Sequence, residues 1–371
     1  MQTVLNESVD QNLLIDGRMS RRRFVGTATA AALAASAARA EEPAAKHNEE
    51  GAAHMDYTAV RGFNYQPSYG SSGLELWQKF DAALVDAEIG RGRAFFPRMN
   101  ALRIWLSWDS FKRNPKRCGD NFETLLSIAH KHGATVMPVL FNRWHDAALD
   151  YGGIYLDHFL PRSSWVQQPD MFTPYLEAIV GKHAADARVF AWDLCNEPFA
   201  YGRPPEEIPE IVKAEYAWLE DVHRRCKKLG AKAPITVGIH PGHGRKGIEQ
   251  IEPLSDLLSI HPYWTGPKHD KAAYERLLDE YVDFAGKVQK PVVASETCWG
   301  EIDDARRVEI IRYTLGELKK RRIGWLAYLL HHSLIADAHR PEFGPLSGPG
   351  NLAFIEADGT LRPGHEIFNE F

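Results

Sequence analysis

Short apolar runs that alternate with longer amphipathic segments constrain the fold of this chain most strongly, because the alternation repeats eight times. Each short run is rich in β-branched and other apolar residues, which is typical of strands buried on both faces of a parallel sheet. The eight expected strands are Val60–Tyr65, Ala101–Leu106, Thr135–Leu140, Val189–Leu194, Ile235–Ile239, Leu257–His261, Pro291–Ser295 and Ile323–Tyr328.

The segments between these runs have helical periodicity, for example Glu206–Leu229, Lys271–Val288 and Asp303–Lys320. Parallel strands joined by helices form either a doubly wound open sheet or a closed barrel. Eight units over roughly 310 residues match a barrel with enlarged loops better than a doubly wound sheet, which usually has fewer strands. We therefore predict an α/β protein with a single (β/α)₈ TIM barrel and no second folded domain.

The first 40 residues differ from the rest and predict an export signal. Ser20–Val25 reads SRRRFV and precedes a weakly apolar, Ala-rich run that ends in a small-x-small cleavage site, Ala38-Arg39-Ala40. This pattern resembles a twin-arginine signal peptide. The alternatives are a membrane anchor and an ordinary N-terminal helix. The run is shorter than the about 20 strongly apolar residues of a spanning helix, and Thr27 and Thr29 interrupt it.

This pattern divides the chain into a signal peptide over residues 1–40, an Ala- and Glu-rich linker over 41–57 and a barrel domain over 58–371. Cleavage after Ala40 would leave a periplasmic or secreted protein without stable membrane association. Met19 stands directly before the arginine motif, so either Met1 or Met19 can be the start of the chain.

The composition excludes several other classes of protein. The 371 residues are 44% hydrophobic and 25% charged, which is ordinary for a globular chain. The formal net charge is −5, and no long basic run lies outside the N-terminus, so we expect no nucleic-acid partner. The four cysteines form no CxxC pair, so we expect buried free thiols at Cys118, Cys195, Cys226 and Cys298.

Two glutamates follow predicted strands at the end of a barrel where active sites lie. The fourth strand leads into Asn196-Glu197-Pro198, and the seventh leads into Glu296. Either glutamate alone is more typical of a surface or salt-bridge residue, but after strands four and seven they would face one another across the rim. A carboxylate pair is what glycosidic bond cleavage requires, because one protonates the leaving oxygen and the other meets the positive charge at the anomeric carbon.

Six short motifs resemble those of glycoside hydrolase family 5, the cellulase and mannanase family. The strongest is Trp192–Pro198, which is similar to the W-x-L-x-N-E-P signature of retaining β-glycosidases with a (β/α)₈ barrel. The other five are the Glu296 segment, Arg61–Tyr65, Asn100–Ile104, Phe141–Trp144 and His261–Tyr263. The resemblance extends from about residue 60 to about residue 330 and implies the same barrel fold.

The resemblance also implies a role for each matched residue. Glu197 would be the general acid/base, and Glu296 would be the nucleophile of a double displacement. Arg103 would brace the carboxylates, Asn196 would hold the sugar 2-hydroxyl, and Tyr263 and His261 would form hydrogen bonds near Glu296. The complete set expected to bind substrate is Arg103, Asn142, Trp144, Asn196, His261, Tyr263, Trp299 and Tyr328.

The chain departs from the family pattern in two places. The eighth strand lacks a second Trp where the family often places a sugar platform, and Tyr328 replaces it. Many family members carry a His pair after the third strand, whereas this chain has Asn142-Arg143-Trp144 followed by Tyr151-Gly152-Gly153, which is more similar to the mannanase branch.

Aromatic residues near strand ends can either stack on sugars or pack in the core. Both interpretations are open for the Trp residues that follow predicted strands, which are Trp108, Trp144, Trp264 and Trp299. We expect structural roles for those within elements, which are Trp192, Trp218 and Trp325.

Other motifs do not support a cofactor or a metal. Gly242–Gly247 fits GxGxxG, but Pro241 precedes it and Pro253 follows closely, so we predict a loop rather than a dinucleotide site. The first strand has Phe63-Asn64-Tyr65 where a metal-dependent barrel hydrolase would have a His-x-His pair, and no HExxH occurs.

The sequence therefore predicts an exported, monomeric, retaining β-glycoside hydrolase that acts without cofactor or metal. Its expected partner is a β-linked polysaccharide or oligosaccharide of the mannan or glucan type. The alternatives are a carbohydrate-binding barrel that has lost catalysis and a transglycosylase of the same fold.

Overall fold

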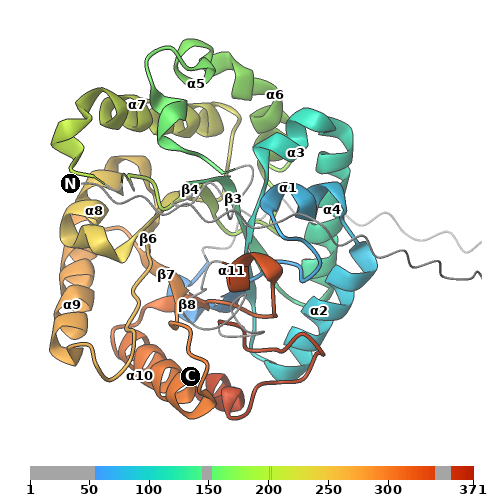
Figure 1. The fold of residues 1–371 in the computed structure, drawn as a ribbon, viewed down its shortest axis with the longest axis vertical. Helices are drawn as coiled ribbons and strands as arrows, with labels where there is room; N and C mark the ends of the chain where they lie inside the picture. Colours follow the sequence, from blue (N-terminus) through green and yellow to red (C-terminus); the bar gives the residue numbers. More distant parts are fainter. Residues whose placement is uncertain (1–54, 144–152, 200, 202, 339–351) are drawn as a thin grey trace, which may run out of the picture. The chain divides into compact units, whose positions relative to one another are not determined.

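Eight parallel strands close into a barrel in which each strand pairs with the next along the chain and β8 pairs with β1 (Figure 1). The structure is a computed structural model that describes residues 55–143, 153–199, 201, 203–338 and 352–371. The strands are β1 (Arg61–Asn64), β2 (Ala101–Trp105), β3 (Thr135–Asn142), β4 (Trp192–Asn196), β5 (Ile235–Ile239), β6 (Leu258–Ile260), β7 (Val292–Thr297) and β8 (Gly324–Ala327). The predicted (β/α)₈ barrel is confirmed.

Helices surround the strands as an outer ring (Figure 1). The α-helices are α1 (Gly73–Gln78), α2 (Ala82–Phe95), α3 (Trp108–Arg113), α4 (Pro115–Lys131), α5 (Ser164–Gln167), α6 (Thr173–Leu176), α7 (Pro209–Lys228), α8 (Gly244–Ile251), α9 (Lys271–Val288), α10 (Asp304–Lys320) and α11 (Leu334–Ala338). Shorter helical turns are η1 (Tyr57–Ala59), η2 (Leu156–Phe159), η3 (Pro169–Phe172), η4 (Glu177–Gly181), η5 (Pro205–Glu207), η6 (Pro241–His243), η7 (Glu252–Leu254) and η9 (His365–Glu370).

Side-chain caps explain where several helices begin. The Asp81 carboxylate accepts the backbone N–H groups of Ala83 and Leu84 at the start of α2. Asp270 and Asp303 cap α9 and α10 in the same way, which satisfies N–H groups that have no partner inside a helix. These caps place α9 on its predicted bounds and α10 within one residue of them.

Two of the three apolar clusters in the described residues pack against the barrel strands. The larger one fills the layer between helices and strands and includes Phe122, Trp192 and Trp218. The smaller one joins residues at or near the amino ends of the strands, including Val60, Ala101, Met137, Leu257 and Val293. Apolar side chains fill the amino end of the barrel. A site with polar and charged side chains is therefore expected at the carboxyl ends of the strands.

Two local predictions were wrong. The fourth strand runs over Trp192–Asn196 rather than Val189–Leu194, because Val189 forms only an isolated bridge with Val136. Gly242–Gly247 is not a loop, since η6 and then α8 begin there. Pro253 does not prevent α8, because it lies beyond the end of that helix, in the first turn of η7, where proline is tolerated.

Some predictions lie outside the described residues, namely the signal peptide over 1–40, most of the linker over 41–57 and the position of Trp144. Among the helices that the structure does describe, none has the length and apolar character needed to cross a membrane. The four cysteines are all free and buried, as predicted.

Candidate active site

Glu197 and Glu296 lie close together at the carboxyl ends of β4 and β7. Glu197 is 8% exposed and Glu296 is 6% exposed. One carboxylate oxygen of each residue and one ring nitrogen of His261 all lie within 4.8 Å of one another. The structure therefore brings the two predicted carboxylates together across the barrel rim.

The chain turns sharply at Glu197. The residue has a φ of 46°, in the left-handed region that non-glycine residues adopt at a cost of about 1–2 kcal/mol. Its backbone N–H donates to the carbonyl of Gly238 on β5, at 2.9 Å. This hydrogen bond to the neighbouring strand holds the strained turn that ends β4 directly before the carboxylate.

Arg103 on β2 connects the acidic groups at the base of the site. Its Nη1 lies 2.5 Å from Oε1 of Glu296, and its Nη2 lies 2.8 Å from Oδ2 of Asp193. The same guanidinium donates to Oδ1 of Asn64 at 3.1 Å and to Oδ1 of Asn196 at 2.8 Å. Arg103 is completely buried, so a fixed positive charge with planar donor geometry is surrounded by partners.

The charges of this network shift each other's ionisation. Burial opposes the charge of Arg103, but the carboxylates of Asp193 and Glu296 outweigh it and raise the pKa of the guanidinium. Burial raises the pKa of Asp193, against the lowering effect of Arg103. Arg103 therefore stays cationic beside Glu296 and Asp193.

Tyr263 provides a second fixed contact to Glu296. Its hydroxyl donates to Oε2 at 2.8 Å, so the two oxygens of Glu296 are held by Arg103 and Tyr263 respectively. Burial, together with the negative charge of Glu296, raises the pKa of Tyr263 well above its ordinary value. The phenol therefore remains a hydrogen-bond donor at neutral pH.

His261 lies between the two glutamates and is closer to Glu197. Its Nδ1 is 2.7 Å from Oε1 of Glu197 and 3.6 Å from Oε2 of Glu296. The sequence predicted that His261 forms its hydrogen bond near Glu296. In the structure its shorter contact is with Glu197 instead. A Cβ atom at Gly238 would lie 2.7 Å from Nε2 of His261, so only glycine leaves room for the ring there.

Two amides lie side by side at the ends of β3 and β4. Asn142 and Asn196 are register partners, and Nδ2 of Asn196 donates to Oδ1 of Asn142 at 3.0 Å. Asn196 is buried, whereas Asn142 is half-buried at the rim. The pair extends the network from Arg103 outward to the surface of the site.

Two predicted aromatic contacts lie at the rim. Trp299 is half-buried and meets Tyr263 edge to face at a centroid distance of 5.4 Å. Tyr328 is half-buried and meets Trp105 edge to face at 6.0 Å. Their partial exposure beside the carboxylates suits contact with the apolar face of a sugar.

Five further tryptophans in the described residues pack in the core. Trp108 and Trp264 are 8% and 1% exposed, so the core alternative holds for both. Trp192, Trp218 and Trp325 belong to the main apolar cluster, as predicted.

Asn64 and Asp193 are the site residues for which the sequence analysis assigned no role. Asp193 is fully buried in β4, and its Oδ1 also accepts the N–H of Gly238 at 3.1 Å. Asn64 accepts from Arg103 and donates to the carbonyl of Ser295 at 2.8 Å. A charged residue inside an apolar strand needs a buried partner, and that rule was the available signal for Asp193.

Two clusters in the described residues have the side chains for a metal ion. In Glu197, His261 and Glu296, both oxygens of Glu296 already accept hydrogen bonds, Oε1 from Arg103 and Oε2 from Tyr263. The other cluster is Glu123, His183 and Asp186, whose two carboxylates pair with Arg188 at 2.7 and 2.6 Å. Neither arrangement favours a metal over the contacts present.

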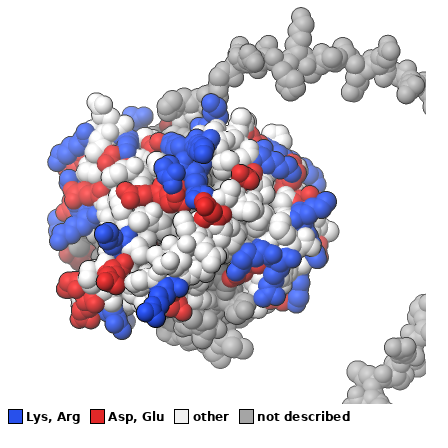
Figure 2. Space-filling model, turned by 90° about the horizontal axis from the view of Figure 1, so that it is seen from above, with Lys and Arg blue, Asp and Glu red and all other residues white. Residues whose placement is uncertain are grey.

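The charged surface is mixed where Figure 2 shows it. Lysines and arginines are interspersed with aspartates and glutamates on that face. A long basic surface of the kind that binds a nucleic-acid backbone is not visible there.

No protein-family model matches this chain. A curated mannan endo-1,4-β-mannosidase A from Aspergillus aculeatus is 26% identical over 123 residues, which are 31% of this chain and 29% of that protein. The chain spans about a third of the length of the curated relatives that it matches.

Solved structures resemble the whole barrel. An exo-β-1,4-mannosidase from Opitutaceae bacterium strain TAV5 has a TM-score of 0.63 at 19% identity, covering 83% of this chain and 58% of that one. GH5_18 from Streptomyces cattleya, in complex with GlcNAc, has a TM-score of 0.63 at 16% identity, covering 83% and 78%. This chain thus shares the (β/α)₈ barrel fold of these structures.

Proposed function

We propose that this protein is a retaining β-glycoside hydrolase in which Glu197 is the acid/base and Glu296 is the nucleophile. The observation that carries the proposal is the pair itself, whose oxygens lie within 4.8 Å of each other, together with the buried guanidinium that holds Glu296. Two carboxylates in different environments are what divides the roles of acid and nucleophile in such a reaction.

In the first step, the carboxylate of Glu296 attacks the anomeric carbon while protonated Glu197 delivers its proton to the leaving oxygen. Arg103 and Tyr263 favour the anionic form of Glu296 and fix both of its oxygens. The proton of the pair then resides on Glu197, because two nearby carboxylates are not readily ionised together. His261 orients Glu197 through its 2.7 Å contact.

In the second step, water displaces the sugar from Glu296. Once Glu296 is esterified its negative charge is gone, so Glu197 can accept a proton from the attacking water. Asn196 would bind the 2-hydroxyl through the amide that faces Asn142, and Trp299 and Tyr328 would contact the sugar faces. Trp144, which follows Asn142 and Arg143, is assigned to the same substrate region by the sequence motif alone.

The carboxylate spacing supports retention of the anomeric configuration. Retaining enzymes have carboxyl groups about 5–5.5 Å apart, whereas inverting enzymes leave about 6.5–9.5 Å for a water between them. Oxygens that lie within 4.8 Å of each other leave no such space.

We assign a β-mannosidic substrate, with β-1,4-mannan or its oligosaccharides as the first choice over glucan. The named relatives support this choice, since they are mannan endo-1,4-β-mannosidases and an exo-β-1,4-mannosidase. Structural relatives in complex with Manβ1-4GlcNAc also support a β-mannoside at this type of site.

We further propose that the chain is exported by the twin-arginine route and acts outside the cytoplasm as a monomer. The arginine motif at Arg21–Arg23 and the Ala38-Arg39-Ala40 cleavage site support this. Polysaccharides are too large to enter a cell freely, so an exported enzyme suits the proposed substrate.

A panel of β-mannan, cellulose, xylan and laminarin, assayed for new reducing ends, tests the proposed activity. We expect release of reducing ends from β-mannan and initial formation of the β-anomer, observed by NMR during the first turnovers. Activity on glucan alone would contradict the assignment of a β-mannosidic substrate. An initial α-product would exclude retention of the anomeric configuration.

A further inference from the structure

A buried arginine close to the rim of the candidate active site has no part in the mechanism above. Arg307 lies near the start of α10, and its side chain is completely buried. In the described part of the chain, every hydrogen-bond acceptor of its guanidinium is a backbone carbonyl rather than a carboxylate. Burial lowers the pKa of Arg307 to about 9, as expected for a buried charge without a carboxylate partner. An uncharged side chain would serve apolar packing better, so packing alone does not explain this residue.

The guanidinium uses all four of its Nη–H groups, on three segments of the chain. Nη1 donates to the carbonyls of Cys298 and Trp299, in the segment after β7. Nη2 donates to the carbonyl of Tyr328 at 2.9 Å, directly after β8, and to that of Leu352 at 2.8 Å. Nε has no hydrogen-bond partner among the described residues. One rigid, planar group therefore ties the segment after β7 to the segment after β8.

The segment that leads from Glu296 to Trp299 is strained and is held by this contact. Cys298 has a φ of 68°, in the left-handed region that is unfavourable for a residue other than glycine. The carbonyls of Cys298 and Trp299 accept hydrogen bonds from the same Nη1 of Arg307. Arg307 therefore fixes the turn that places Trp299 after the strand that carries Glu296.

Two of the four carbonyls belong to the aromatic residues at the rim. Trp299 meets Tyr263 edge to face, and the Tyr263 hydroxyl donates to Oε2 of Glu296. Tyr328 follows β8 and is also half-buried. Arg307 therefore holds the backbone of both residues that would contact a sugar in the proposed function.

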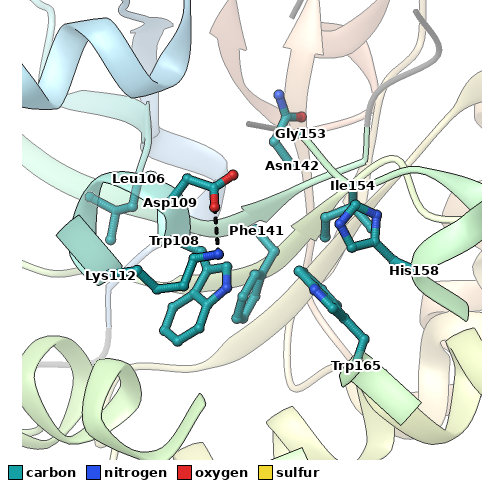
Figure 3. Close-up of a pocket in the computed structure, with 10 residues that line it drawn as sticks. All are labelled: Leu106, Trp108, Asp109, Lys112, Phe141, Asn142, Gly153, Ile154, His158 and Trp165. Carbon is teal, nitrogen blue, oxygen red and sulfur yellow. Dashed lines mark ion pairs between the residues drawn. The ribbon is translucent and has the colours of Figure 1, made fainter. Parts of the chain in front are cut away.

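Aromatic residues near the ends of β2 and β3 are held in a different way. Trp108, Phe141 and Trp165 line the pocket drawn in Figure 3 and are buried in the main apolar cluster, so surrounding side chains fix their rings. Trp299 and Tyr328 are half-buried, and a ring that is left open to a ligand has less protein packed around it. A backbone fixed by hydrogen bonds compensates for this missing packing.

We propose that Arg307 is a positioning residue that fixes Trp299 and Tyr328 relative to each other, so that both rings meet the sugar in one geometry. The inference rests on the proposed function, because it needs a sugar at these two rings. Arg307 acts through two backbone carbonyls, so its effect on catalysis must pass through the rings. This dependence separates a positioning role from a contribution to stability alone.

The first part of the test is Arg307→Lys, which keeps the positive charge and loses the planar group that reaches four carbonyls. On β-1,4-mannohexaose, kcat/KM should fall roughly 10- to 100-fold, because small displacements at a substrate site have effects of this size. The fall should appear mainly as a higher KM. Partial unfolding would instead lower the apparent kcat and leave KM unchanged, since the folded fraction binds normally.

The second part repeats the change after both rings have been removed. In Trp299→Ala/Tyr328→Ala there is no ring left to position. Adding Arg307→Lys to this double variant should lower kcat/KM by no more than about twofold, because residues that act as one unit do not have additive effects. An effect that does not pass through the rings would give the same fall in both backgrounds.

Arg362→Lys is the matched control, because Arg362 is another buried arginine of the same region. It donates to the carbonyls of Glu301, Ile302 and Ala353, which lie in the same two segments as the carbonyls that Arg307 holds. Arg362→Lys should lower the melting temperature but keep KM within about twofold of the wild-type value, as expected for a site independent of the rings.

The outcomes separate this inference from the proposed function. If the wild type cleaves mannohexaose but Arg307→Lys leaves KM unchanged, or lowers kcat/KM equally in both backgrounds, the positioning role is wrong and the hydrolase stands. If the wild type cleaves neither mannohexaose nor any polysaccharide of the panel above, both proposals fail. A melting curve for each variant checks folding. Arg307→Met, which has no charge to bury, replaces Arg307→Lys in both backgrounds if that variant does not fold.

Discussion

The guanidinium of Arg103 donates to Oε1 of Glu296 across 2.5 Å, and the two side chains are 0% and 8% exposed. A charge-assisted contact of this length fixes the orientation of the carboxylate before substrate arrives. It also distinguishes Glu296 from Glu197, whose carboxylate is instead contacted by His261. The division of roles that we propose for the two glutamates is based on this difference.

The first prediction concerns the carboxylate pair. Glu197→Gln should lose most activity on mannan, roughly 10²- to 10⁴-fold, because it cannot protonate a poor leaving group. Activated aryl glycosides need little protonation, so their glycosylation step should be largely spared. Pre-steady-state release of the aryl group measures this step, and an equal loss on both substrates would contradict the role of Glu197.

The second prediction concerns the hydroxyl of Tyr263. Tyr263→Phe removes a hydrogen bond to an anionic Glu296, which is worth about 1.5–3 kcal/mol, so kcat/KM should fall roughly 10- to 100-fold. Tyr281→Phe is the matched control, because the buried Tyr281 hydroxyl has no partner in the described residues. Equal activity of the two variants would show that Tyr263 does not support the nucleophile.

The third prediction concerns acid stability and His365. Burial, together with the nearby Arg307 and Arg362, lowers the pKa of His365 to about 3. The unfolded chain binds a proton near pH 6.5 that the folded chain does not, so stability falls as the pH decreases from about 6.5 toward 3. The loss of stability by pH 4 is about 3 kcal/mol, at about 1.4 kcal/mol for each pH unit below 6.5.

Urea unfolding of wild type and His365→Asn at several pH values measures this contribution. The variant should show a flatter loss of stability between pH 6.5 and pH 4, whatever its absolute stability. The exposed-site variant His130→Asn should keep the wild-type slope. If the free energy of unfolding falls with the same slope between pH 6.5 and pH 4 in wild type and His365→Asn, His365 is not the cause of the acid destabilisation.

The fourth prediction concerns export. The secreted protein should begin at Glu41 or within a few residues of it, since Ala38-Arg39-Ala40 supplies small residues at the cleavage site. Changing Arg21, Arg22 and Arg23 to Lys should leave uncleaved precursor inside the cell. N-terminal sequencing checks this, and an intact Met1 or Met19 on the exported protein would show that no cleavage occurs.

The sequence predicted the barrel because strand and helix periodicities differ enough to be counted along the chain. It predicted Glu197 and Glu296 because both follow apolar runs at positions where barrel sites form. The sequence predicted that the fourth strand begins at Val189, but β4 begins at Trp192. Val189–Ala191 is as apolar as a strand, yet only an isolated bridge between Val189 and Val136 forms there.

The connections within the site needed three-dimensional structure. Asp193 and Asn64 contact Arg103 from strands far apart in the sequence, and no spacing rule links them. The contact of His261 with Glu197 likewise depends on how β4 and β6 face each other and on the space left by Gly238. Whether Trp108 and Trp264 bind sugar or pack in the core depends on burial that local sequence does not encode.

Trapping the covalent intermediate tests the central proposal most directly. The enzyme is incubated with 2-deoxy-2-fluoro-β-mannosyl fluoride, which forms the glycosyl-enzyme readily and releases it slowly, and is then digested and analysed by mass spectrometry. We expect one fluorosugar on the peptide that contains Glu296, and no label in Glu296→Gln. A fluorosugar attached to Glu197 or another residue, or an enzyme that turns over mannan but is never labelled, would contradict Glu296 as the nucleophile.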